Sequence, residues 1–276
     1  MSKKIIHAAL LGLGTVGTGV YKVLKSQEEE MEQKIGAAVA IKKILVRNLK
    51  KAAAKLQEPE LLTDSWQEIL EDESIDIIIE VMGGIHPAKE YITAALRAGK
   101  HVVTANKDLV ASFGGELLDC AAEHHCDFLF EASVAGGIPI IRPLKQCLAG
   151  NHISEVVGIV NGTTNFILTK MTQEHMEFAD ALALATRLGY AEADPTADIQ
   201  GYDAGRKVAI MASIAFNSRV TFEDVSTEGI THISSKDIRY AKELGCVIKL
   251  LGVAKNAENG ICLLYTSPSP RDKRQS

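Results

Sequence analysis

One polar stretch of the chain, YAEADPTADIQGYDAGRK, combines residue types that could hold a small charged molecule. It contains the carboxylates Glu192, Asp198 and Asp203, and then Lys207 at the start of an apolar helical pattern. Asp203 and Lys207 are four residues apart and fall on the apolar face of that helix. A lysine aimed at an apolar face must be paired or functional, because an unpaired buried ammonium is costly. The stretch favours a site built to grip an amino acid over its alternative, a solvated loop.

A second candidate site is the glycine turn GLGTVG, which follows an apolar strand pattern and precedes a helical one. Gly12 would permit the tight turn, Gly14 would let the backbone approach a pyrophosphate, and Gly17 would let the helix lie close to the strand. Thr15 and Val16 stand at the helix start, where free N–H groups and the positive dipole end favour phosphates. In this context the turn predicts a dinucleotide-binding site.

The end of the next predicted strand, AVAIKKILVR, indicates which dinucleotide would bind. An acidic residue there would hold the ribose 2′-hydroxyl of NAD. The chain instead has Arg47 followed by Asn48, with Lys50 and Lys51 nearby. A guanidinium without an acidic competitor suits a 2′-phosphate, so we expect NADP to be preferred over NAD. The alternative is an exposed basic turn, and use of both cofactors stays open.

Alternating strands and helices must position these motifs. Strand patterns at AVAIKKILVR, IDIIIEVMGG, HVVTANK and DFLFEASV are separated by helical patterns such as PAKEYITAALRAGK. Helical crossovers of this length imply a parallel sheet, so the predicted fold class is α/β, a Rossmann-type doubly wound parallel sheet. Ligands bind at the carboxyl ends of such strands. The TANK motif falls there and adds three predicted cofactor-binding residues: Thr104, Asn106 and Lys107.

After Glu131 the regular alternation stops, and helices and strands follow in mixed order. We therefore predict an NAD(P)-binding Rossmann domain at residues 1–131 and an α+β domain at residues 132–261 that supplies the substrate side. Residues 262–276, CLLYTSPSPRDKRQS, are rich in Ser, Pro and charge and lack a core pattern. We expect them to form a disordered tail of non-native sequence.

Composition limits the function classes. The 276 residues, 46% hydrophobic and 24% charged, are typical of a soluble globular protein and suffice for two domains or one large one. The net charge of −5 provides no basic field for nucleic acid or an anionic membrane surface. No segment predicts a membrane span or a signal peptide. The five cysteines show no pairing pattern, and we expect reduced thiols in a cytoplasmic protein.

Six motifs occur in a fixed order: GLGTVG, VMGG, GKHVVTANKDL, EASVAGGIPII, VNGTTNFIL and YAEADPTADIQGYDAGRK. Together they closely resemble homoserine dehydrogenase, over residues 5 to 261. The resemblance implies the NAD(P)-linked interconversion of L-homoserine and L-aspartate 4-semialdehyde. This reaction lies on the route from aspartate to threonine, methionine and isoleucine.

The resemblance also implies roles for single residues. Lys207 matches the family's general acid–base lysine, and Lys107 matches a second lysine near the nicotinamide and the substrate. Glu192 and Asp203 match the carboxylates that hold the substrate's ammonium and its reacting end. Three further positions match the substrate site: Asp198, Gly162 and Thr163. In the oxidative direction the acid–base lysine must first be neutral, which predicts an alkaline optimum.

A cation site is implied as well. Glu131, with the backbone carbonyls of Val134, Gly136 and Ile138, matches a site for a monovalent cation such as Na⁺ that looks structural. The alternative is a plain glycine turn. In the complete protein the resemblance implies a homodimer, built on further strands and a last helix, and many members add a regulatory ACT domain. The chain lacks these parts, so the α+β domain is expected to be incomplete.

Two alternative functions stay open. One is another Rossmann reductase that acts on an amino-acid aldehyde or imine; the combination of Lys107, Lys207 and Glu192 argues against it. The other is a nucleotide-binding fragment without turnover, whose pocket is left open by the missing segments. An acylating semialdehyde dehydrogenase would need a nucleophilic cysteine, and none of the five lies in a suitable strand–helix turn.

Overall fold

The computed structural model describes residues 5–54, 56–257, 260–265 and 269–270. The chain divides into two compact units, Met1–Ile138 and Pro139–Ser276. The division falls after Ile138, whereas the sequence predicted it after Glu131. Residues 132–138 stay with the first unit, in which Val134 is buried and the Ser133 hydroxyl donates to the carbonyl of Phe130 at 2.6 Å.

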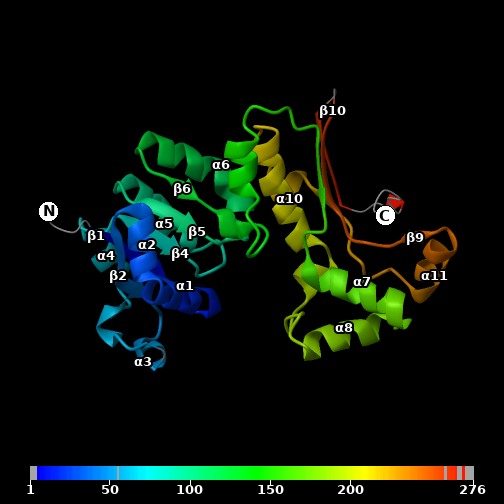
Figure 1. The fold of residues 1–276 in the computed structure, drawn as a ribbon, viewed down its shortest axis with the longest axis horizontal. Helices are drawn as coiled ribbons and strands as arrows, with labels where there is room; N and C mark the ends of the chain where they lie inside the picture. Colours follow the sequence, from blue (N-terminus) through cyan, green and yellow to red (C-terminus); the bar gives the residue numbers. More distant parts are fainter. Residues whose placement is uncertain (1–4, 55, 258–259, 266–268, 271–276) are drawn as a thin grey trace. The chain divides into compact units, whose positions relative to one another are not determined.

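Unit 1 is built on a six-stranded sheet (Figure 1). Its strands are β1 (Ile5–Leu11), β2 (Ala38–Leu45), β3 (Leu62–Thr63), β4 (Ile77–Glu80), β5 (His101–Thr104) and β6 (Phe128–Leu129). They lie in the order β3-β2-β1-β4-β5-β6, and every neighbouring pair is parallel. This order confirms the predicted doubly wound Rossmann fold, with its switch point between β1 and β4.

Helices connect these strands in two groups. The first group is α1 (Thr15–Ser26), α2 (Glu28–Ile35) and α3 (Leu49–Ala53), and the second is α4 (Trp66–Leu70), which contacts α5, then α5 (Ala88–Arg97) and α6 (Lys107–Glu123). α1 contacts α2 and β2, whereas α5 contacts α6, β4 and β5 (Figure 1). Because right-handed crossovers run outward from β1 in one direction and from β4 in the other, the two groups cover opposite faces. Two short 3-10 turns, η1 (Pro59–Leu61) and η2 (Glu131–Ser133), complete the unit.

Unit 2 has the predicted α+β character. Its helices are α7 (Gly162–Glu174), α8 (Phe178–Arg187), α9 (Thr196–Ile199), α10 (Tyr202–Ala215) and α11 (Ser235–Glu243), with the short turns η3 (Pro143–Cys147) and η4 (Phe222–Asp224). Its sheet has the order β7-β10-β11-β8, from β7 (Glu155–Gly158), β8 (Ser226–Thr227), β10 (Gly252–Ala257) and β11 (Gly260–Tyr265). A cluster that includes Val208, Ala212 and Ala254 packs α10 on this sheet.

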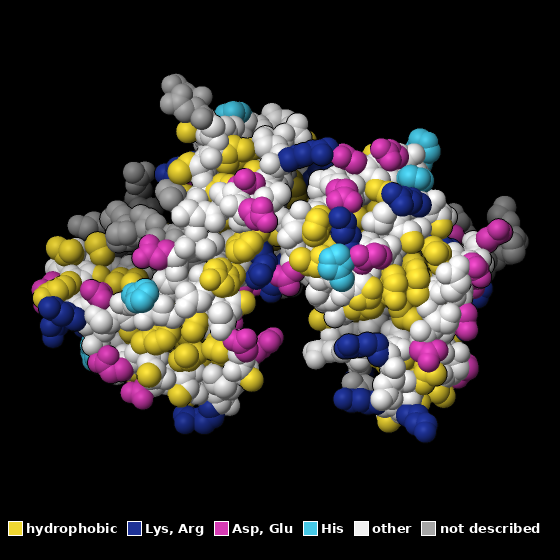
Figure 2. Space-filling view, turned by 180° about the vertical axis from the view of Figure 1, so that it is seen from behind, with side chains coloured by type: hydrophobic (Ala, Val, Ile, Leu, Met, Phe, Trp, Pro, Cys, Tyr) yellow, Lys and Arg dark blue, Asp and Glu magenta, His cyan; other side chains and the backbone are white. Residues whose placement is uncertain are grey.

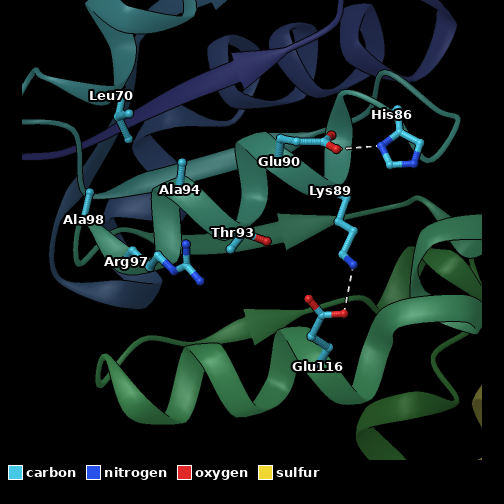
Figure 3. Close-up of a pocket in the computed structure, with 9 residues that line it drawn as sticks. All are labelled: Leu70, His86, Lys89, Glu90, Thr93, Ala94, Arg97, Ala98 and Glu116. Atoms are coloured by element: carbon cyan, nitrogen blue, oxygen red, sulfur yellow. Dashed lines mark hydrogen bonds and ion pairs between the residues drawn. The ribbon is translucent and has the colours of Figure 1, made fainter.

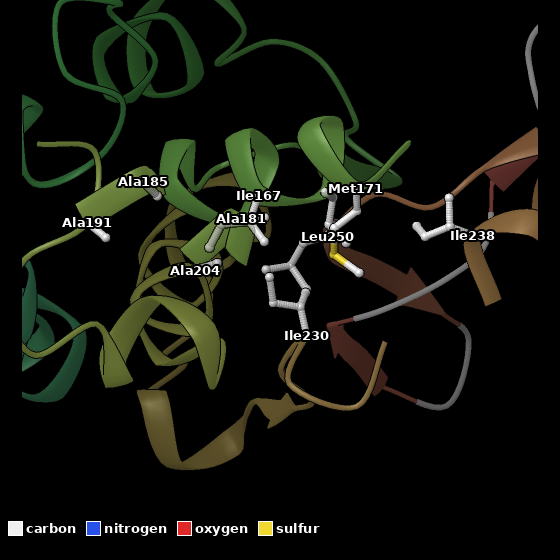
Figure 4. Packing of buried hydrophobic residues seen from close by; sticks show 10 residues of the cluster. Ile167, Met171, Ala181, Ala185, Ala191, Ala204, Ile230, Ile238 and Leu250 are labelled. Carbon is white, nitrogen blue, oxygen red and sulfur yellow. The ribbon is translucent and has the colours of Figure 1, made fainter. Parts of the chain in front are cut away.

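A second core of unit 2 holds the helices together (Figure 4). Ile167 and Met171 of α7 face Ala181 and Ala185 of α8, and Ala204 of α10 joins them, all nearly inaccessible to solvent. Small residues on α8 and α10 bring these helices close to α7. This core therefore fixes the start of α7 and the start of α10, which carry the polar residues described below.

The predicted tail begins too early. Residues 262–265 belong to β11, which pairs antiparallel with β10, and Leu263 is buried opposite Ala254. The expectation of a structureless segment from residue 262 is therefore wrong for these residues, because the strand pairs with β10 and Leu263 joins the core between α10 and the sheet. Residues 269–270 form β12, which pairs with β9 (Cys246–Val247). The remaining tail residues lie outside the described ranges.

The surface carries charges of both signs. Figure 2 shows acidic and basic side chains interspersed over the visible face of each unit, without a region of one sign. All five cysteines are free thiols, in agreement with the lack of a pairing pattern. Within the described ranges, no helix has the length and apolarity needed to cross a membrane.

Candidate active site

The three glycines of the GLGTVG turn meet different surroundings. Gly12 has φ +102°, and a Cβ there would lie 3.1 Å from the carbonyl oxygen of Val81 on the neighbouring strand end. A Cβ on Gly17 would lie 2.1 Å from the Gly12 carbonyl oxygen, so α1 can approach the turn only without a side chain there. A Cβ on Gly14 would meet no atom of another part of the chain within 4 Å. The protein itself requires Gly12 and Gly17, whereas the space at Gly14 is left open, as a phosphate cradle needs.

Thr15 and Val16 lie at the start of α1, where both are exposed. The helix has Gly14 as its N-cap, without a side-chain cap bond. Its first N–H groups are therefore available to an anion, and the positive end of the helix dipole points the same way.

A cleft of about 550 Å³ adjoins the turn in unit 1. Gly12, Gly14 and Arg47 line it, together with Lys51. The Arg47 side chain is exposed and has no hydrogen bond or ion pair among the described residues. One acidic residue, Asp64 after β3, also lines the cleft. The end of β2 carries no acid, as the sequence showed, but the next strand supplies one to the same cleft.

A buried carboxylate ties two strand ends together beside this cleft. Glu80, the last residue of β4, is 0% exposed and accepts the hydroxyl of Thr104 at 2.6 Å and the backbone N–H of Met82 at 2.8 Å. The Thr104 oxygen in turn accepts the N–H of Asn106 at 3.0 Å. Sequence reasoning missed Glu80; an acid that ends the apolar run IDIIIE was its only signal.

The predicted residues of the TANK motif lie at this edge of the sheet. The Asn106 side chain caps α6 by accepting the N–H of Leu109 at 3.1 Å, and its amide donates to the carbonyl of Gly84 at 2.6 Å. Lys107 is the half-buried first residue of α6. None of the three TANK residues lines the cleft that Gly14 and Arg47 share. The side-chain bonds of Thr104 and Asn106 hold the strand-to-helix connections in place.

In unit 2, α10 carries the predicted lysine and carboxylate. The side chains of Asp203 and Lys207 are 4% and 18% exposed, and Lys207 Nζ lies 2.6 Å from Asp203 Oδ2. Lys207 Nζ also donates to the carbonyl of Val160 at 2.8 Å. The structure confirms that Lys207 points inward and is paired, as the helix face predicted.

Asn161 connects this pair to Asp198. Its side-chain nitrogen donates to Asp198 Oδ1 at 2.7 Å and to Asp203 Oδ2 at 2.9 Å. We call these four residues, Asn161, Asp198, Asp203 and Lys207, the polar cluster. Sequence reasoning missed Asn161, although VNGTTNFIL has the Asn-before-helix pattern of an N-cap.

The other predicted substrate residues are placed around the start of α7. Gly162 is its exposed first residue, and the buried Thr163 hydroxyl donates to the carbonyl of Tyr190 at 2.7 Å. Glu192 is exposed, and no hydrogen bond or ion pair joins it to the polar cluster in the described part of the chain. Asp194 accepts the N–H of Thr196 at 3.1 Å, a bond typical of a turn residue.

Comparison with known proteins places these features in a family. Two family models match, "Homoserine dehydrogenase, NAD binding domain" at residues 12–131 and "Homoserine dehydrogenase" at residues 139–270. A homoserine dehydrogenase of Bacillus subtilis is 48% identical over 252 residues, 91% of this chain and 58% of that protein. A homoserine dehydrogenase structure from Thiobacillus denitrificans is 47% identical with a TM-score of 0.93, over 99% of this chain and 63% of that chain. An Archaeoglobus fulgidus structure assigned to homoserine dehydrogenase is 31% identical with a TM-score of 0.84, over 96% of this chain and 84% of that chain.

The chain belongs to the homoserine dehydrogenase family. It spans little more than half the length of the curated homoserine dehydrogenases it matches, 58% for the Bacillus protein. The family's NAD-binding domain coincides with unit 1, which contains the glycine turn. A hyperthermophilic archaeal homoserine dehydrogenase in complex with NADPH has the same fold, with 26% identity and a TM-score of 0.78, over 98% of this chain and 83% of that chain.

The loop for which the homoserine dehydrogenase resemblance implies a cation runs from Glu131 to Ile138. Glu131 begins the 3-10 turn η2, Val134 is buried, Gly136 is exposed and Ile138 is 68% exposed. No cluster of three or more His, Cys, Asp or Glu suited to a metal occurs in the ranges that the structure describes. The predicted site uses one carboxylate and three carbonyls, so it stays a prediction.

A second groove of unit 1, of about 680 Å³, lies along α5 between α4 and α6 (Figure 3). Its charges are largely paired with each other. Lys89 Nζ lies 2.9 Å from Glu116 Oε2, and His86 Nδ1 lies 2.6 Å from Glu90 Oε1. Because these pairs neutralise each other, the groove offers a ligand little net charge, and we assign it no role in homoserine dehydrogenase chemistry.

Proposed function

We propose that this chain carries the NAD(P)-dependent interconversion of L-homoserine and L-aspartate 4-semialdehyde. The observation that carries the proposal is the inward-facing Lys207, bonded to the nearly inaccessible Asp203 in the motif that resembles the family's catalytic stretch. A polar cluster of this kind indicates a functional role. Burying charged groups costs free energy, and a packed apolar core at the same place would not have this cost.

The cofactor half of the proposal rests on unit 1. The open space at Gly14 fits a phosphate, since a Cβ there would occupy it, and the N–H groups at the start of α1 would bind the pyrophosphate. Arg47 is exposed in the same cleft and would bind a 2′-phosphate, so we propose NADP as the preferred cofactor. Asp64 could instead accept the 2′-hydroxyl of NAD, so use of NAD also stays open. When bound, the nicotinamide cofactor supplies or accepts the hydride.

Lys207 would manage the proton. Reduction of the aldehyde needs a proton at the carbonyl oxygen, and an ammonium can donate it while it stabilises the developing negative charge. The hydrogen bonds of Lys207 to Asp203 and to the Val160 carbonyl fix the position of its nitrogen. Oxidation of homoserine requires the neutral amine first, so we expect the oxidative rate to rise with pH. Lys107, at the start of α6, is proposed as the second lysine.

The substrate's ammonium would be held by carboxylates. Glu192 is exposed and forms no ion pair or hydrogen bond with another described residue, so its carboxylate is available to a cationic ligand. Asp198 supports the cluster through its bond from Asn161. Gly162 leaves the start of α7 uncovered, and Thr163 is bonded to the Tyr190 carbonyl beside it. These features favour an amino acid as the substrate class.

Several finer features are also part of the proposal. We propose a monovalent cation such as Na⁺ at the loop of Glu131, Val134, Gly136 and Ile138, and a homodimer for the whole protein. The five free cysteines suit a reducing cytoplasm, and the reaction would serve threonine, methionine and isoleucine biosynthesis.

The experiment is homoserine-dependent reduction of NADP by this chain, with NAD in parallel and the Lys207→Ala variant as control. We expect turnover with the parent chain and at least a hundredfold less with the variant. Isothermal titration with NADPH on both proteins measures cofactor binding separately. Cofactor binding without homoserine turnover would contradict the proposal and support the alternative of a nucleotide-binding chain that does not catalyse.

A further inference from the structure

Asn161 lies at the centre of the polar cluster, and its amide orientation is fixed. The residue is 5% exposed. Its side-chain oxygen accepts the backbone N–H of Thr164 at 2.8 Å and the Thr164 hydroxyl at 2.8 Å. Since a backbone N–H can only donate, the amide nitrogen must face the other way, toward Asp198 and Asp203. Each hydrogen of the NH₂ group then has one carboxylate acceptor.

The bond to Asp203 reaches the same oxygen that holds the lysine. Asp203 Oδ2 accepts from Asn161 Nδ2 at 2.9 Å and from Lys207 Nζ at 2.6 Å. Asn161 and Lys207 therefore donate to the same carboxylate oxygen. The bond from Asn161 lowers the negative charge available to Lys207 and so affects the position and the proton affinity of the lysine. The amide also lets two carboxylates approach each other without adding a charge of its own.

We propose that Asn161 is a positioning residue: its amide bridges Asp198 and Asp203 and thereby sets the orientation and proton affinity of the acid–base Lys207. The acid–base role of Lys207 rests on the proposed function. The bridge that Asn161 makes between the two carboxylates does not depend on it. Asn161 is the N-cap of α7, and the bridge joins the starts of α7, α9 and α10. A ligand that moves the start of α7 at Gly162 would thus act on Lys207.

Two carboxylates are joined to Lys207 by the bonds described above. Asp203, on the same helix, contacts it directly, and Asp198 of α9 is connected to it through Asn161 and Asp203. The chain before α7 contributes the neutral carbonyl of Val160. Arg206 is the residue before Lys207 on α10. Its guanidinium carbon lies 4.9 Å from the centre of the Phe222 ring. A change of chemistry at position 161 would act directly next to Lys207, because both side chains bond the same oxygen of Asp203.

The first test is Asn161→Asp, compared with Asn151→Asp. Asn151 is exposed in a turn of unit 2, so that variant adds the same charge without touching the polar cluster. The titration of the Lys207 side chain is followed by NMR on lysine-labelled full chain, with Lys207→Met to assign the signal. Asn161→Asp should move the titration midpoint of Lys207, because it replaces the amide donor at Asp203 by a third carboxyl group that competes for the same protons. Asn151→Asp should leave it in place.

The second test, Asn161→Ser, separates the cap from the bridge. Serine is also a good N-cap, so the bond to the N–H of Thr164 is kept, whereas both donors to Asp198 and Asp203 are lost. We expect kcat to fall at least about tenfold, with the KM for NADP changed less than twofold, since the nucleotide cleft is in unit 1. The pH profile of the oxidative rate should shift with the Lys207 titration.

The outcomes separate this proposal from the proposed function. An Asn161→Asp chain whose Lys207 titrates as in Asn151→Asp would overturn the positioning role. If Asn161→Asp does not fold, an Asn161→Ser chain with the parent's Lys207 midpoint would overturn it equally. A shifted midpoint in a parent chain that lacks homoserine turnover would support the positioning role and contradict the function.

Discussion

The nucleotide cleft of unit 1 and the polar cluster of unit 2 are built from different materials. In unit 1 the backbone shapes the site: Gly12 has positive φ, and Gly17 lies against the Gly12 carbonyl where no side chain fits. In unit 2 side chains shape it, because Asn161, Asp203 and Lys207 are joined by bonds of 2.6 to 2.9 Å. In unit 1, a side chain added at Gly12 or Gly17 would collide with backbone atoms. In unit 2, removal of one charged partner would leave the other buried without its ion pair.

The difference has a consequence for pH. The glycine turn contains no titratable group, so its fit to a phosphate should hold wherever unit 1 is folded. The polar cluster holds two carboxylates bonded to one amide, and a lysine bonded to one of these carboxylates. Its working state therefore depends on protonation, and its variants should be told apart by pH profiles.

The largest expected effect is that of Gly17→Ala. The new Cβ would lie 2.1 Å from the Gly12 carbonyl oxygen, and since that atom is backbone, α1 must move away from β1. We expect unit 1 to lose more than about 3 kcal/mol of stability and NADPH binding to disappear. Urea denaturation and calorimetric titration measure the two effects.

The matched control is Gly14→Ala, where a Cβ would meet no atom of another part of the chain within 4 Å. Its stability should change by less than about 1 kcal/mol, while NADPH binding weakens because the methyl group fills the cradle. Equal losses of stability in the two variants would contradict the difference between a crowded Gly17 and an open Gly14.

Lys207→Ala is the corresponding change in unit 2. It removes the cation from the buried Asp203, so we expect at least a hundredfold loss of turnover and a stability loss of about 3 kcal/mol. NADPH affinity should be unchanged, because the residues that line the cleft all belong to unit 1.

The double variant Lys207→Ala, Asp203→Ala serves as the control. It removes both charges, so it should regain much of the stability and none of the turnover. Near-parental turnover in Lys207→Ala, measured by NADP reduction with homoserine, would remove Lys207 from the mechanism.

The same contrast explains what could be predicted from sequence. The spacing of Gly12, Gly14 and Gly17 between a strand and a helix determines the turn, since each glycine acts on its own neighbours along the chain. The alternating patterns also predicted the doubly wound sheet. Glu80 was missed, because its role depends on Thr104, which only the pairing of β4 with β5 brings near.

In unit 2 only the local part of the cluster was predictable. The four-residue spacing of Asp203 and Lys207 on one helix predicted their pairing and inward direction. Asn161 lies 42 positions before Asp203 and 37 before Asp198, so no periodicity connects them. Glu192 was grouped with the cluster by closeness in sequence, and the structure leaves it exposed and unbonded to it within the described part of the chain.

A smaller effect is expected from Arg47→Ala, which tests the one charged contact proposed for the cleft. We expect NADP affinity to fall about tenfold and NAD affinity less than twofold, because only NADP carries the 2′-phosphate. Competition binding with both nucleotides measures this ratio. Lys50→Ala is the control: Lys50 is exposed in α3, shortly after Arg47, but does not line the cleft. Equal effects of Arg47→Ala on both nucleotides would exclude the 2′-phosphate role and favour NAD bound by Asp64.

The smallest effect concerns a titrating pair of unit 1 that lies outside the cleft. The Tyr21 hydroxyl donates to Glu58 Oε2 at 2.7 Å. Burial, and to a smaller extent this hydrogen bond, raise the pKa of Tyr21 from 10.0 to about 12. Because the folded state holds the phenolic proton more tightly, this stabilisation is complete below pH 10.0 and is lost as the pH rises to about 12.

Tyr21→Phe should therefore cost about 1 kcal/mol of unfolding free energy near neutral pH, and the difference from the parent should vanish at the alkaline end. Ultraviolet titration of the phenolates should show one of the six tyrosines ionising late in the parent, and that step should be missing in the variant. NADPH binding should not change, since Tyr21 does not line the cleft. A variant that loses NADPH affinity near neutral pH would show that unit 1 depends on a titratable side chain after all, and the contrast with unit 2 would fail.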